Sequence, residues 1–359
     1  MDNIGRYRLD RRLGAGSFAT VWLGHDDGLD VPVAVKVLAE NWAANDDVRD
    51  RFLAEARIMR RIRDHRIVQV YDIGTLSDGR PYFVMDFIDG GSMDDLRRDR
   101  IHPTSALWLC AEACRAIDVL HQNQVIHRDV TPGNLLLSRD QSGATRVVIA
   151  DLGVAKSMVD VAGATMTAGT PSYMAPEQAT GMAALDRRAD IYSLTAVTYA
   201  MLTGSPPFPV RNLADIVTRD RHATPTPIAT RLNAPASLDA LMVSGLAWDP
   251  SRRPPTAALL AGALDGIRYE IQSRSRQAAG TSVQTSTRYF AAERPTVARQ
   301  QPATPPSHGL PAATEAPAHR QPLPRLQARS RPASYYVLVI LCAAAVFMVS
   351  MLATILVLR

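Results

Sequence analysis

The sequence predicts an α+β protein with two unequal lobes, a small β-rich lobe and a larger helical lobe, followed by one C-terminal transmembrane helix. Up to Phe87 the apolar residues form short runs of strand length, separated by turns that contain glycine. After Gly90 and Gly91 they recur at helical spacing instead. Residues 335–358 contain no charged side chain. A β-rich segment followed by a helical one is typical of an α+β architecture with a hinge between its parts.

The two lobes are predicted to form one domain over residues 1–270, with the hinge near 86–91. In the first lobe a helix is predicted over 48–63, because Asn45 or Asp46 can cap its first turn. The strands of this lobe are expected at 7–13, 19–24, 31–38, 67–71 and 82–87. The helices of the second lobe are expected at 105–122, 189–202, 238–247 and 256–264.

Residues 271–334 are predicted to form a disordered linker beside the membrane. The segment 272–334 holds nine Pro, nine Arg and two Glu, with few large apolar residues. Such a composition cannot bury enough apolar surface to offset the entropy of the chain. The net charge of the chain is +5. Residues 272–334 carry +7 and Arg359 carries +1, so residues 1–271 sum to −3. A slightly acidic body disfavours nucleic-acid binding, whereas a basic linker favours a position beside anionic lipids.

The uncharged segment 335–358 is predicted to cross a membrane once. Its 24 residues would form a helix of about 36 Å, against roughly 30 Å of bilayer hydrocarbon. A buried core helix is the alternative, but core helices rarely stay apolar on every face over this length. Arginines precede the segment and only Arg359 follows it, which places residues 1–334 in the cytoplasm and the C-terminus outside the cell membrane. Neither a signal peptide nor an outside domain is expected.

A glycine-rich turn, residues 14–19, lies between the first two predicted strands. Glycines in such a turn let backbone N–H groups approach phosphate oxygens closely. A dinucleotide-binding loop would lead into a helix, and a Walker loop would end in Gly-Lys-Ser or Gly-Lys-Thr. Neither pattern is present here, because a strand follows the turn and the lysine is missing. The turn is therefore compatible with phosphate binding of another kind.

One of only two lysines in the chain, Lys36, lies on the third predicted strand. An ammonium group on an apolar strand needs a partner, because burying it unpaired is costly. Glu55 on the following helix is the expected partner. Further polar motifs follow in the order His127-Arg128-Asp129, Asn134, Asp151-Leu152-Gly153, Ala175-Pro176-Glu177, Asp190 and Arg253.

This ordered set of motifs resembles the eukaryotic-like protein Ser/Thr kinases of bacteria, in particular the transmembrane ones. The resemblance covers residues from about 6 to 266. Each motif alone is a weak signal, but all of them in the family's order are specific. The resemblance implies the two-lobed protein kinase fold and an enzyme that transfers a phosphate from ATP to proteins. It also implies a buried ion pair between Glu177 and Arg253.

The resemblance implies a role for each matching residue. Lys36 would hold the α- and β-phosphates of ATP while paired with Glu55. Asn134 and Asp151 would bind Mg²⁺, or Mn²⁺ in its place. Asp129 would orient the attacking hydroxyl and accept its proton. The residues expected around ATP are Leu13, Gly14, Ala15, Gly16, Ser17, Val21, Ala34, Lys36, Met85, Asp86, Ile88 and Leu136. An apolar column that links the lobes would consist of Met59, Val70, His127 and Leu152.

The catalytic segment departs from the family pattern at Thr131, where the family usually has a lysine. Tyrosine kinases can place a compensating arginine two positions later, but that position is Gly133. One positive charge near the transferred phosphate is therefore missing, which can lower the rate by orders of magnitude. The main interpretation is an active kinase. The alternative is an ATP-binding pseudokinase scaffold with weak or no transfer activity.

Two further features concern substrates and control. Thr170 and Pro132 match the Ser/Thr form of the substrate-binding loop, so the resemblance implies protein substrates with Ser or Thr acceptors. Arg128 is the form associated with activation by phosphorylation, and Thr165 and Thr167 are the expected sites. The resemblance also makes a homodimer and autophosphorylation between its copies reasonable expectations.

Overall fold

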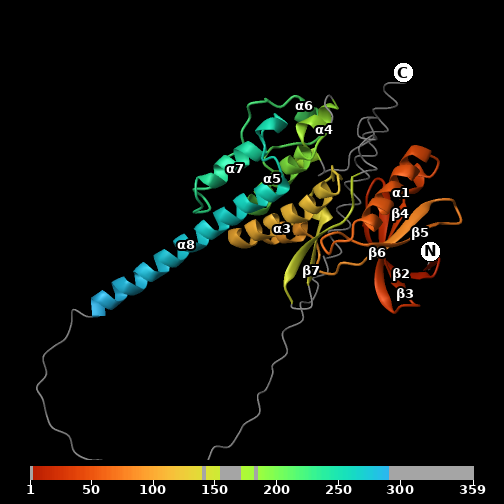
Figure 1. The fold of residues 1–359 in the computed structure, drawn as a ribbon, viewed down its shortest axis with the longest axis horizontal. Helices are drawn as coiled ribbons and strands as arrows, with labels where there is room; N and C mark the ends of the chain where they lie inside the picture. Colours follow the sequence, from red (N-terminus) through yellow and green to blue (C-terminus); the bar gives the residue numbers. More distant parts are fainter. Residues whose placement is uncertain (1–2, 140–142, 154–170, 182–184, 291–359) are drawn as a thin grey trace, which may run out of the picture. The chain divides into compact units, whose positions relative to one another are not determined.

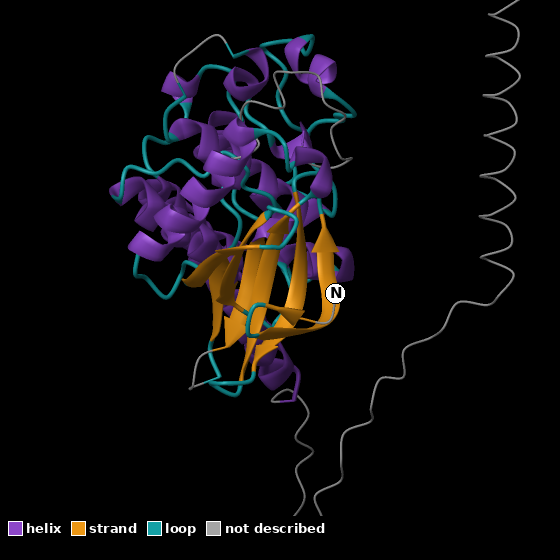
Figure 2. Ribbon diagram, turned by 90° about the vertical axis from the view of Figure 1, so that its right-hand side faces the viewer, coloured by secondary structure: helices purple, strands orange, loops and turns teal. Residues whose placement is uncertain are grey.

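The computed structural model describes residues 3–139, 143–153, 171–181 and 185–290. In these residues the strands gather in one lobe and most helices lie in another, as Figures 1 and 2 show. The N-terminal lobe contains a sheet and helix α1, and the C-terminal lobe is mainly helical. This is the two-lobed α+β architecture that the sequence predicts.

Within the described residues, six strands form one antiparallel sheet in the order β1-β2-β3-β4-β6-β5. Strand β4 thus lies between β3 and β6, and β5 is at an edge. The bounds are β1 (Asn3–Ile4), β2 (Tyr7–Ala15), β3 (Ala19–Asp26), β4 (Val31–Leu38), β5 (Val70–Thr75) and β6 (Pro81–Asp86). A separate hairpin consists of β7 (Leu135–Arg139) and β8 (Thr145–Ile149).

Strand β4 contributes to two apolar clusters at once. Val35 and its odd-numbered neighbours pack in a small cluster on one face of the sheet. Ala34 and Leu38 belong to the main core on the other face. Successive side chains of a strand point to opposite faces, so Lys36 shares the face of Ala34 and Leu38. This register explains why a lysine is only 8% exposed.

Helix α1 (Asp46–Arg61) begins after Asn45, whose side chain accepts a hydrogen bond from the Val48 N–H at 3.0 Å. Of the two predicted caps, Asn45 is therefore the one that the structure uses. The buried residues of the helix recur at helical spacing and are Val48, Phe52, Glu55, Ala56 and Met59. Glu55 is the charged member of this apolar stripe, so the helix directs a carboxylate toward the core.

The helical lobe is built around α5, whose side chains are buried from Ala189 to Met201. Helix α3 packs against both α5 and α8. The bounds are α2 (Met93–Asp99), α3 (Pro103–Gln122), α4 (Pro176–Thr180), α5 (Arg188–Thr203), α6 (Leu213–Val217), α7 (Ser237–Gly245) and α8 (Ala257–Phe290). The short helices α2, α4 and α6 were not predicted, because helices of one or two turns show little periodicity.

One predicted strand, 67–71, differs from the structure, where β5 begins at Val70. The apolar residues Ile67 and Val68 pair with Ile149 at the end of β8 instead of joining the sheet. Both are buried in the main core. Their apolar character therefore reflects burial in a connecting segment, a case that apolar runs alone cannot distinguish from a strand.

Helix α8 also differs from its prediction, because it continues to Phe290 and so passes residue 271, where the linker was expected to begin. Between Pro255 and Pro295 the sequence contains no proline to end a helix. Buried side chains occur along this helix as far as Ile271. The rest of the predicted linker and the predicted membrane span, 335–358, lie outside the described residues. Among the described helices, none is both long enough and apolar enough to cross a bilayer.

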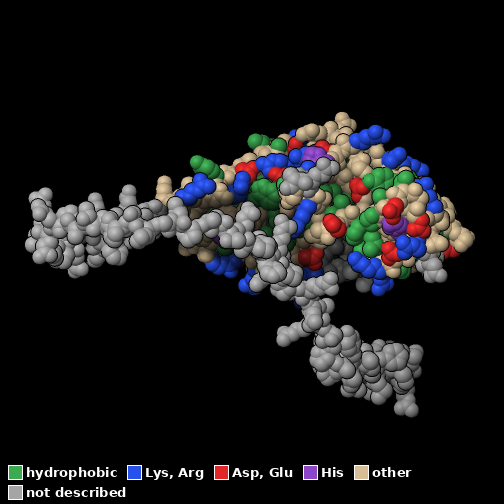
Figure 3. Space-filling model, turned by 90° about the horizontal axis from the view of Figure 1, so that it is seen from below, with side chains coloured by type: hydrophobic (Ala, Val, Ile, Leu, Met, Phe, Trp, Pro, Cys, Tyr) green, Lys and Arg blue, Asp and Glu red, His purple; other side chains and the backbone are tan. Residues whose placement is uncertain are grey.

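The face shown in Figure 3 carries basic and acidic side chains interspersed over the described surface. Many of the charged residues form exposed ion pairs, such as Arg8 with Asp10 and Arg98 with Asp94. A large field of one sign would be needed to steer a polyanion such as a nucleic acid. On this face, the described side chains form no such field.

Candidate active site

The Lys36 ammonium lies between two carboxylates that come from distant parts of the chain. Its Nζ is 2.8 Å from Glu55 Oε1 and 3.0 Å from Asp151 Oδ1. Glu55 is 1% exposed, whereas the side chain of Asp151 is 34% exposed. The structure thus brings the predicted pair of Lys36 and Glu55 into contact. It adds Asp151, which follows β8, and so connects the two lobes at this point.

The charge of Lys36 depends on these two carboxylates. Burial alone would lower the pKa of Lys36, because a buried ammonium loses its hydration. The negative charges of Asp151 and Glu55 outweigh this effect, and the pKa of Lys36 lies above its usual value. A raised pKa means that the pair stabilises the fold at every pH below the range in which lysine titrates. Lys36 is therefore a permanent cation next to the partly exposed Asp151.

Asp129 and Asn134 form a second polar pair in the loop before β7. The Asn134 amide donates to Asp129 Oδ2 at 2.8 Å and to the Asp129 carbonyl oxygen at 2.9 Å. Asp129 is 5% exposed. Because the amide nitrogen of Asn134 is committed to Asp129, the amide oxygen is left to face other groups. The pair fixes the orientation of both side chains.

The carboxylate of Asp190 on α5 accepts backbone hydrogen bonds from the loop that carries Asp129. Asp190 Oδ2 accepts the backbone N–H of His127 at 2.8 Å, and Oδ1 accepts that of Arg128 at 2.9 Å. Arg128 has a φ of 67°, a conformation that costs energy for any residue with a side chain. These two hydrogen bonds to a fully buried carboxylate offset that cost. His121 Nε2 lies 2.8 Å from the same carboxylate, a contact that the sequence does not signal.

The hairpin of β7 and β8 places Asn134 and Asp151 at the same edge. Asn134 directly precedes β7, and Asp151 follows β8 after one residue. The strands are antiparallel and pair Leu135 with Ile149, so the start of one lies beside the end of the other. The Ala150 N–H donates to the Asn134 carbonyl at 3.0 Å. Two polar residues 17 positions apart in the sequence thereby lie at the same end of the hairpin.

Gly153 allows the segment after Asp151 to approach the catalytic loop. Its N–H donates to the His127 carbonyl at 2.9 Å. A Cβ at this position would lie 2.8 Å from the Asp129 Cβ and 3.0 Å from the His127 carbonyl oxygen. Real Cβ atoms do not approach so closely, so only glycine fits here. This explains in physical terms why glycine follows Asp151-Leu152.

The donor atoms at this edge suit a hard divalent cation. Asn134 offers an amide oxygen and Asp151 a partly exposed carboxylate, and Mg²⁺ prefers oxygen ligands. In the described part of the chain, no group of three or more His, Cys, Asp or Glu residues is placed to hold a metal. Mg²⁺ is usually held by one or two protein oxygens together with substrate phosphates rather than by a complete protein cage. The residues present therefore fit Mg²⁺ bound jointly with a phosphate ligand.

Five of the apolar residues expected around ATP belong to the main core or pack against it. Ala34 and Met85 are paired neighbours on β4 and β6. Val21, Ile88 and Leu136 are partly buried and pack against the same core. The backbone N–H of Asp86 donates to the Gln69 carbonyl at 3.0 Å, and its side chain accepts from the Gln69 N–H and the Tyr71 hydroxyl.

The glycine-rich turn connects β2 and β3. Strand β2 continues through Ala15, two residues past its predicted end at Leu13. Gly16 N–H donates to the Ala19 carbonyl at 2.9 Å and closes the turn. The predicted phosphate-covering residues Leu13 to Ser17 thus form the end of a hairpin next to β4, which carries Lys36.

Three of the predicted residues lie outside the described part of the chain, whereas the position that departs from the family pattern, Thr131, lies within it. Thr165, Thr167 and Thr170 fall in residues 154–170, outside the described ranges. Thr131 is half-buried and precedes the short helical turn Pro132–Asn134, and its side chain makes no capping hydrogen bond there. Gly133 in that turn is exposed. The cation that the family usually has at this point is therefore absent from both positions.

Two structural features were expected from the family, an apolar column and a buried ion pair. The four residues of the apolar column are all buried, namely Met59, Val70, His127 and Leu152. Burial lowers the pKa of His127 below its usual value, although the charge of Asp190 opposes this. Arg253 forms a bidentate pair with Glu177, with distances of 2.6 and 2.8 Å. The Arg253 side chain is 0% exposed, so the ion pair is buried as predicted.

Comparison with known proteins agrees with this geometry. The family model of the protein kinase domain matches residues 7–263. The serine/threonine-protein kinase PknJ of Mycobacterium tuberculosis is 37% identical over 276 residues, which cover 72% of this chain and 46% of PknJ. The serine/threonine-protein kinase PknB of the same species is 36% identical over 263 residues, covering 70% of this chain and 41% of PknB.

A solved structure shows the same fold. The crystal structure of the Mycobacterium tuberculosis PknI kinase domain superposes with a TM-score of 0.57 and 27% identity, covering 74% of this chain and 97% of that domain. The chain spans less than half of the length of the curated relatives named above. The matched region contains both lobes and every residue of the site described here. The chain therefore belongs to the protein kinase family, and its relatives are bacterial serine/threonine-protein kinases.

Proposed function

We propose that this chain transfers the γ-phosphate of ATP to Ser and Thr hydroxyls of proteins. One observation carries the proposal: Lys36 is held between Glu55 and Asp151, while Asn134 orients Asp129 at the same edge. This arrangement supplies a fixed cation, an acceptor for a proton and oxygen ligands for a divalent ion. The names of the relatives support Ser and Thr as the acceptors.

Each residue has one task in this proposal. Lys36 holds oxygens of the α- and β-phosphates, and the turn after Leu13 covers the phosphates with backbone N–H groups. Mg²⁺ bound by Asn134 and Asp151 would neutralise charge on the phosphates. Asp129 orients the acceptor hydroxyl and takes up its proton. Phosphoryl transfer requires little else of side chains, because positioning and charge neutralisation account for most of its acceleration.

The test is transfer from radiolabelled ATP by the purified full chain to itself and to a generic protein substrate. We expect label on phosphoserine or phosphothreonine, loss of the label when EDTA removes divalent ions, and its return when Mg²⁺ is added in excess. The control is Lys36→Met, which has a side chain of similar length without the charge. Equal labelling by wild type and Lys36→Met would refute the assignment.

The same samples test the predicted control by autophosphorylation. We expect mass spectrometry to find phosphate on Thr165 or Thr167, where a phosphate near Arg128 would order the segment. Modification confined to residues 272–334 would count against this control.

Thr131 supports a second candidate function, a pseudokinase scaffold that binds ATP with weak or no transfer. The missing cation weakens stabilisation of the transition state without affecting Lys36, Asn134 or Asp151. This candidate predicts that wild type binds ATP in a titration but labels neither itself nor a substrate. The assay above distinguishes the two functions directly.

We further propose that residues 335–358 anchor the chain in the cell membrane with residues 1–334 in the cytoplasm. The uncharged length of this segment and the arginines before it support the proposal. The same arginines would attract anionic lipids. We expect the full chain in a salt-washed membrane fraction, whereas a chain ending at Arg294 is released. Recovery of both chains in one fraction would contradict the anchor.

A further inference from the structure

The tip of the glycine-rich turn is attached to the segment that precedes α1. The rings of Phe18 and Trp42 are stacked, with centroids 5.4 Å apart and planes inclined by 13°. Trp42 Nε1–H donates to the Ser17 carbonyl at 2.9 Å. The Ala39 N–H donates to the Phe18 carbonyl at 2.8 Å. One tryptophan therefore contacts the turn by both an aromatic stack and a hydrogen bond.

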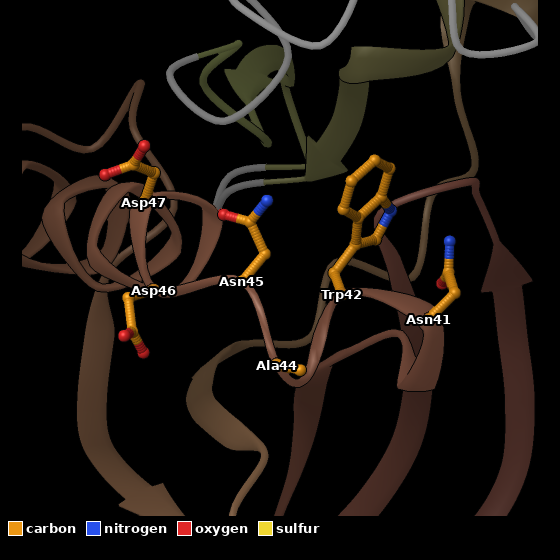
Figure 4. A pocket seen from close by; sticks show the side chains of 6 residues that line it. All are labelled: Asn41, Trp42, Ala44, Asn45, Asp46 and Asp47. Atoms are coloured by element: carbon orange, nitrogen blue, oxygen red, sulfur yellow. The ribbon is translucent and has the colours of Figure 1, made fainter.

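Trp42 is in turn connected to helix α1. It ends a short helical turn, Glu40–Trp42, and its carbonyl accepts the N–H of Asn45 at 3.0 Å. Asn45 caps α1 through the Val48 N–H. Figure 4 shows Trp42 and Asn45 on the segment that leads into α1, both lining one pocket. The contacts thus run from the turn through Trp42 and Asn45 to the helix that carries Glu55.

The turn has few other restraints at its tip. Gly16 gives its backbone access to many conformations. Of the described hydrogen bonds within the turn, the one from the Gly16 N–H to the Ala19 carbonyl closes it. Phe18 and Trp42 are only partly buried and pack against the edge of the main core. The stack on Trp42 therefore contributes much of what restricts the conformations of the tip.

We propose that Trp42 is a positioning residue that holds the tip of the turn in place for the nucleotide phosphates and links it to α1. The inference rests on the proposed function, because it assumes that the turn covers phosphates. A turn already held in place binds its ligand without the entropic cost of becoming ordered. Helix α1 also carries Glu55, which pairs with Lys36. The proposed link therefore connects the order of the turn to the helix that holds the Lys36 ammonium in place.

The inference predicts specific changes in kinetics. Trp42→Ala is expected to raise the KM for ATP by about tenfold, as expected when an aromatic stack and a hydrogen bond are lost. The KM for a protein substrate should stay within about twofold, because the stack and the hydrogen bond of the Trp42 side chain are both made with the turn. Trp42→Phe keeps a stacking ring and loses the Nε1–H donor, so its KM for ATP should lie between those of wild type and Trp42→Ala. Phe18→Ala removes the stack and keeps the hydrogen bond from Trp42 Nε1–H to the Ser17 carbonyl, so its KM for ATP should lie between those of wild type and Trp42→Ala. The double variant should be no worse than Trp42→Ala alone.

The closing experiment measures hydrogen exchange in the full chain without nucleotide. Amide exchange in the peptide that contains Gly16 to Ala19 is expected to accelerate in Trp42→Ala and to stay unchanged in Tyr269→Ala. Tyr269 is a matched control, because it is an aromatic residue on α8 that is 71% exposed. Unchanged exchange in Trp42→Ala would overturn the inference, as would additive effects of Phe18→Ala and Trp42→Ala.

This measurement separates the inference from the proposed function. If wild type transfers no phosphate, the proposed function fails while the exchange data still decide whether Trp42 orders the turn. If wild type transfers phosphate and exchange is unchanged, the inference fails alone. Melting temperatures of all variants complete the set, and a fall in Trp42→Ala without faster exchange in the turn would show a merely structural residue.

Discussion

Asp129→Asn is expected to lower the rate of phosphate transfer by roughly 10²–10⁴-fold, the usual contribution of a positioned acid–base group. The substitution keeps the shape of the side chain and removes its ability to accept a proton. The loop should keep its conformation, because the backbone hydrogen bonds to Asp190 do not involve the changed atoms. The amide oxygen of the new side chain can still accept from Asn134.

The measurement is the initial rate of transfer with ATP and Mg²⁺, together with a nucleotide titration. ATP binding should be almost unchanged, because the proposed phosphate contacts are made by Lys36 and the glycine-rich turn. Asp27→Asn is the matched control, since the Asp27 side chain is 61% exposed and Asp27 lies at the opposite end of β3 from the turn. A rate within threefold of wild type in Asp129→Asn would exclude Asp129 as the base.

Arg253→Met is expected to lower the free energy of unfolding by about 3–5 kcal/mol, the usual cost of breaking a buried ion pair from one side. Arg253 donates to both oxygens of Glu177 and to the carbonyls of Arg188, Ala247 and Trp248. Methionine fills a similar volume and provides no donor. The Glu177 side chain, 10% exposed, would then be a buried charge without its partner.

Urea or thermal unfolding of the purified variant measures this cost. Arg98→Met is the matched control, because Arg98 pairs with Asp94 but is 65% exposed, and exposed pairs contribute about 0–1 kcal/mol. Replacing both partners, as in Glu177→Leu with Arg253→Met, should recover part of the loss, because no buried charge remains. Equal destabilisation by Arg253→Met and Arg98→Met would show that burial does not make the pair important.

The periodicity of the sequence was sufficient to predict which way a side chain faces where that depends only on the helix or strand that carries it. The alternation along β4 assigns Lys36 to one face of the sheet, and the helical spacing of α1 assigns Glu55 to the buried stripe. Both assignments follow from covalent geometry, so they hold wherever the elements form. The predicted contact between the two side chains was therefore accessible without coordinates.

Periodicity failed where burial comes from a neighbour that is distant in the chain. Ile67 and Val68 lie in the main core beside the end of β8, so their apolar run looks like a strand in the sequence although they join no strand of the sheet. Helix α8 packs on α3, has buried side chains as far as Ile271 and contains no proline, so it continues past residue 270. One practical consequence is that a soluble fragment should end near Arg294, since ending it at residue 271 would cut α8.

By itself, the sequence determined the order of the motifs, the two-lobed architecture and the facing of Lys36 and Glu55, because these depend on local spacing. Only the tertiary structure decided that Asp151 reaches Lys36, that Asp190 holds the strained backbone of Arg128, and that Trp42 stacks on the glycine-rich turn. Such contacts join segments far apart in the chain. Their geometry is set by how helices and strands pack, which the spacing of residues within one segment does not specify.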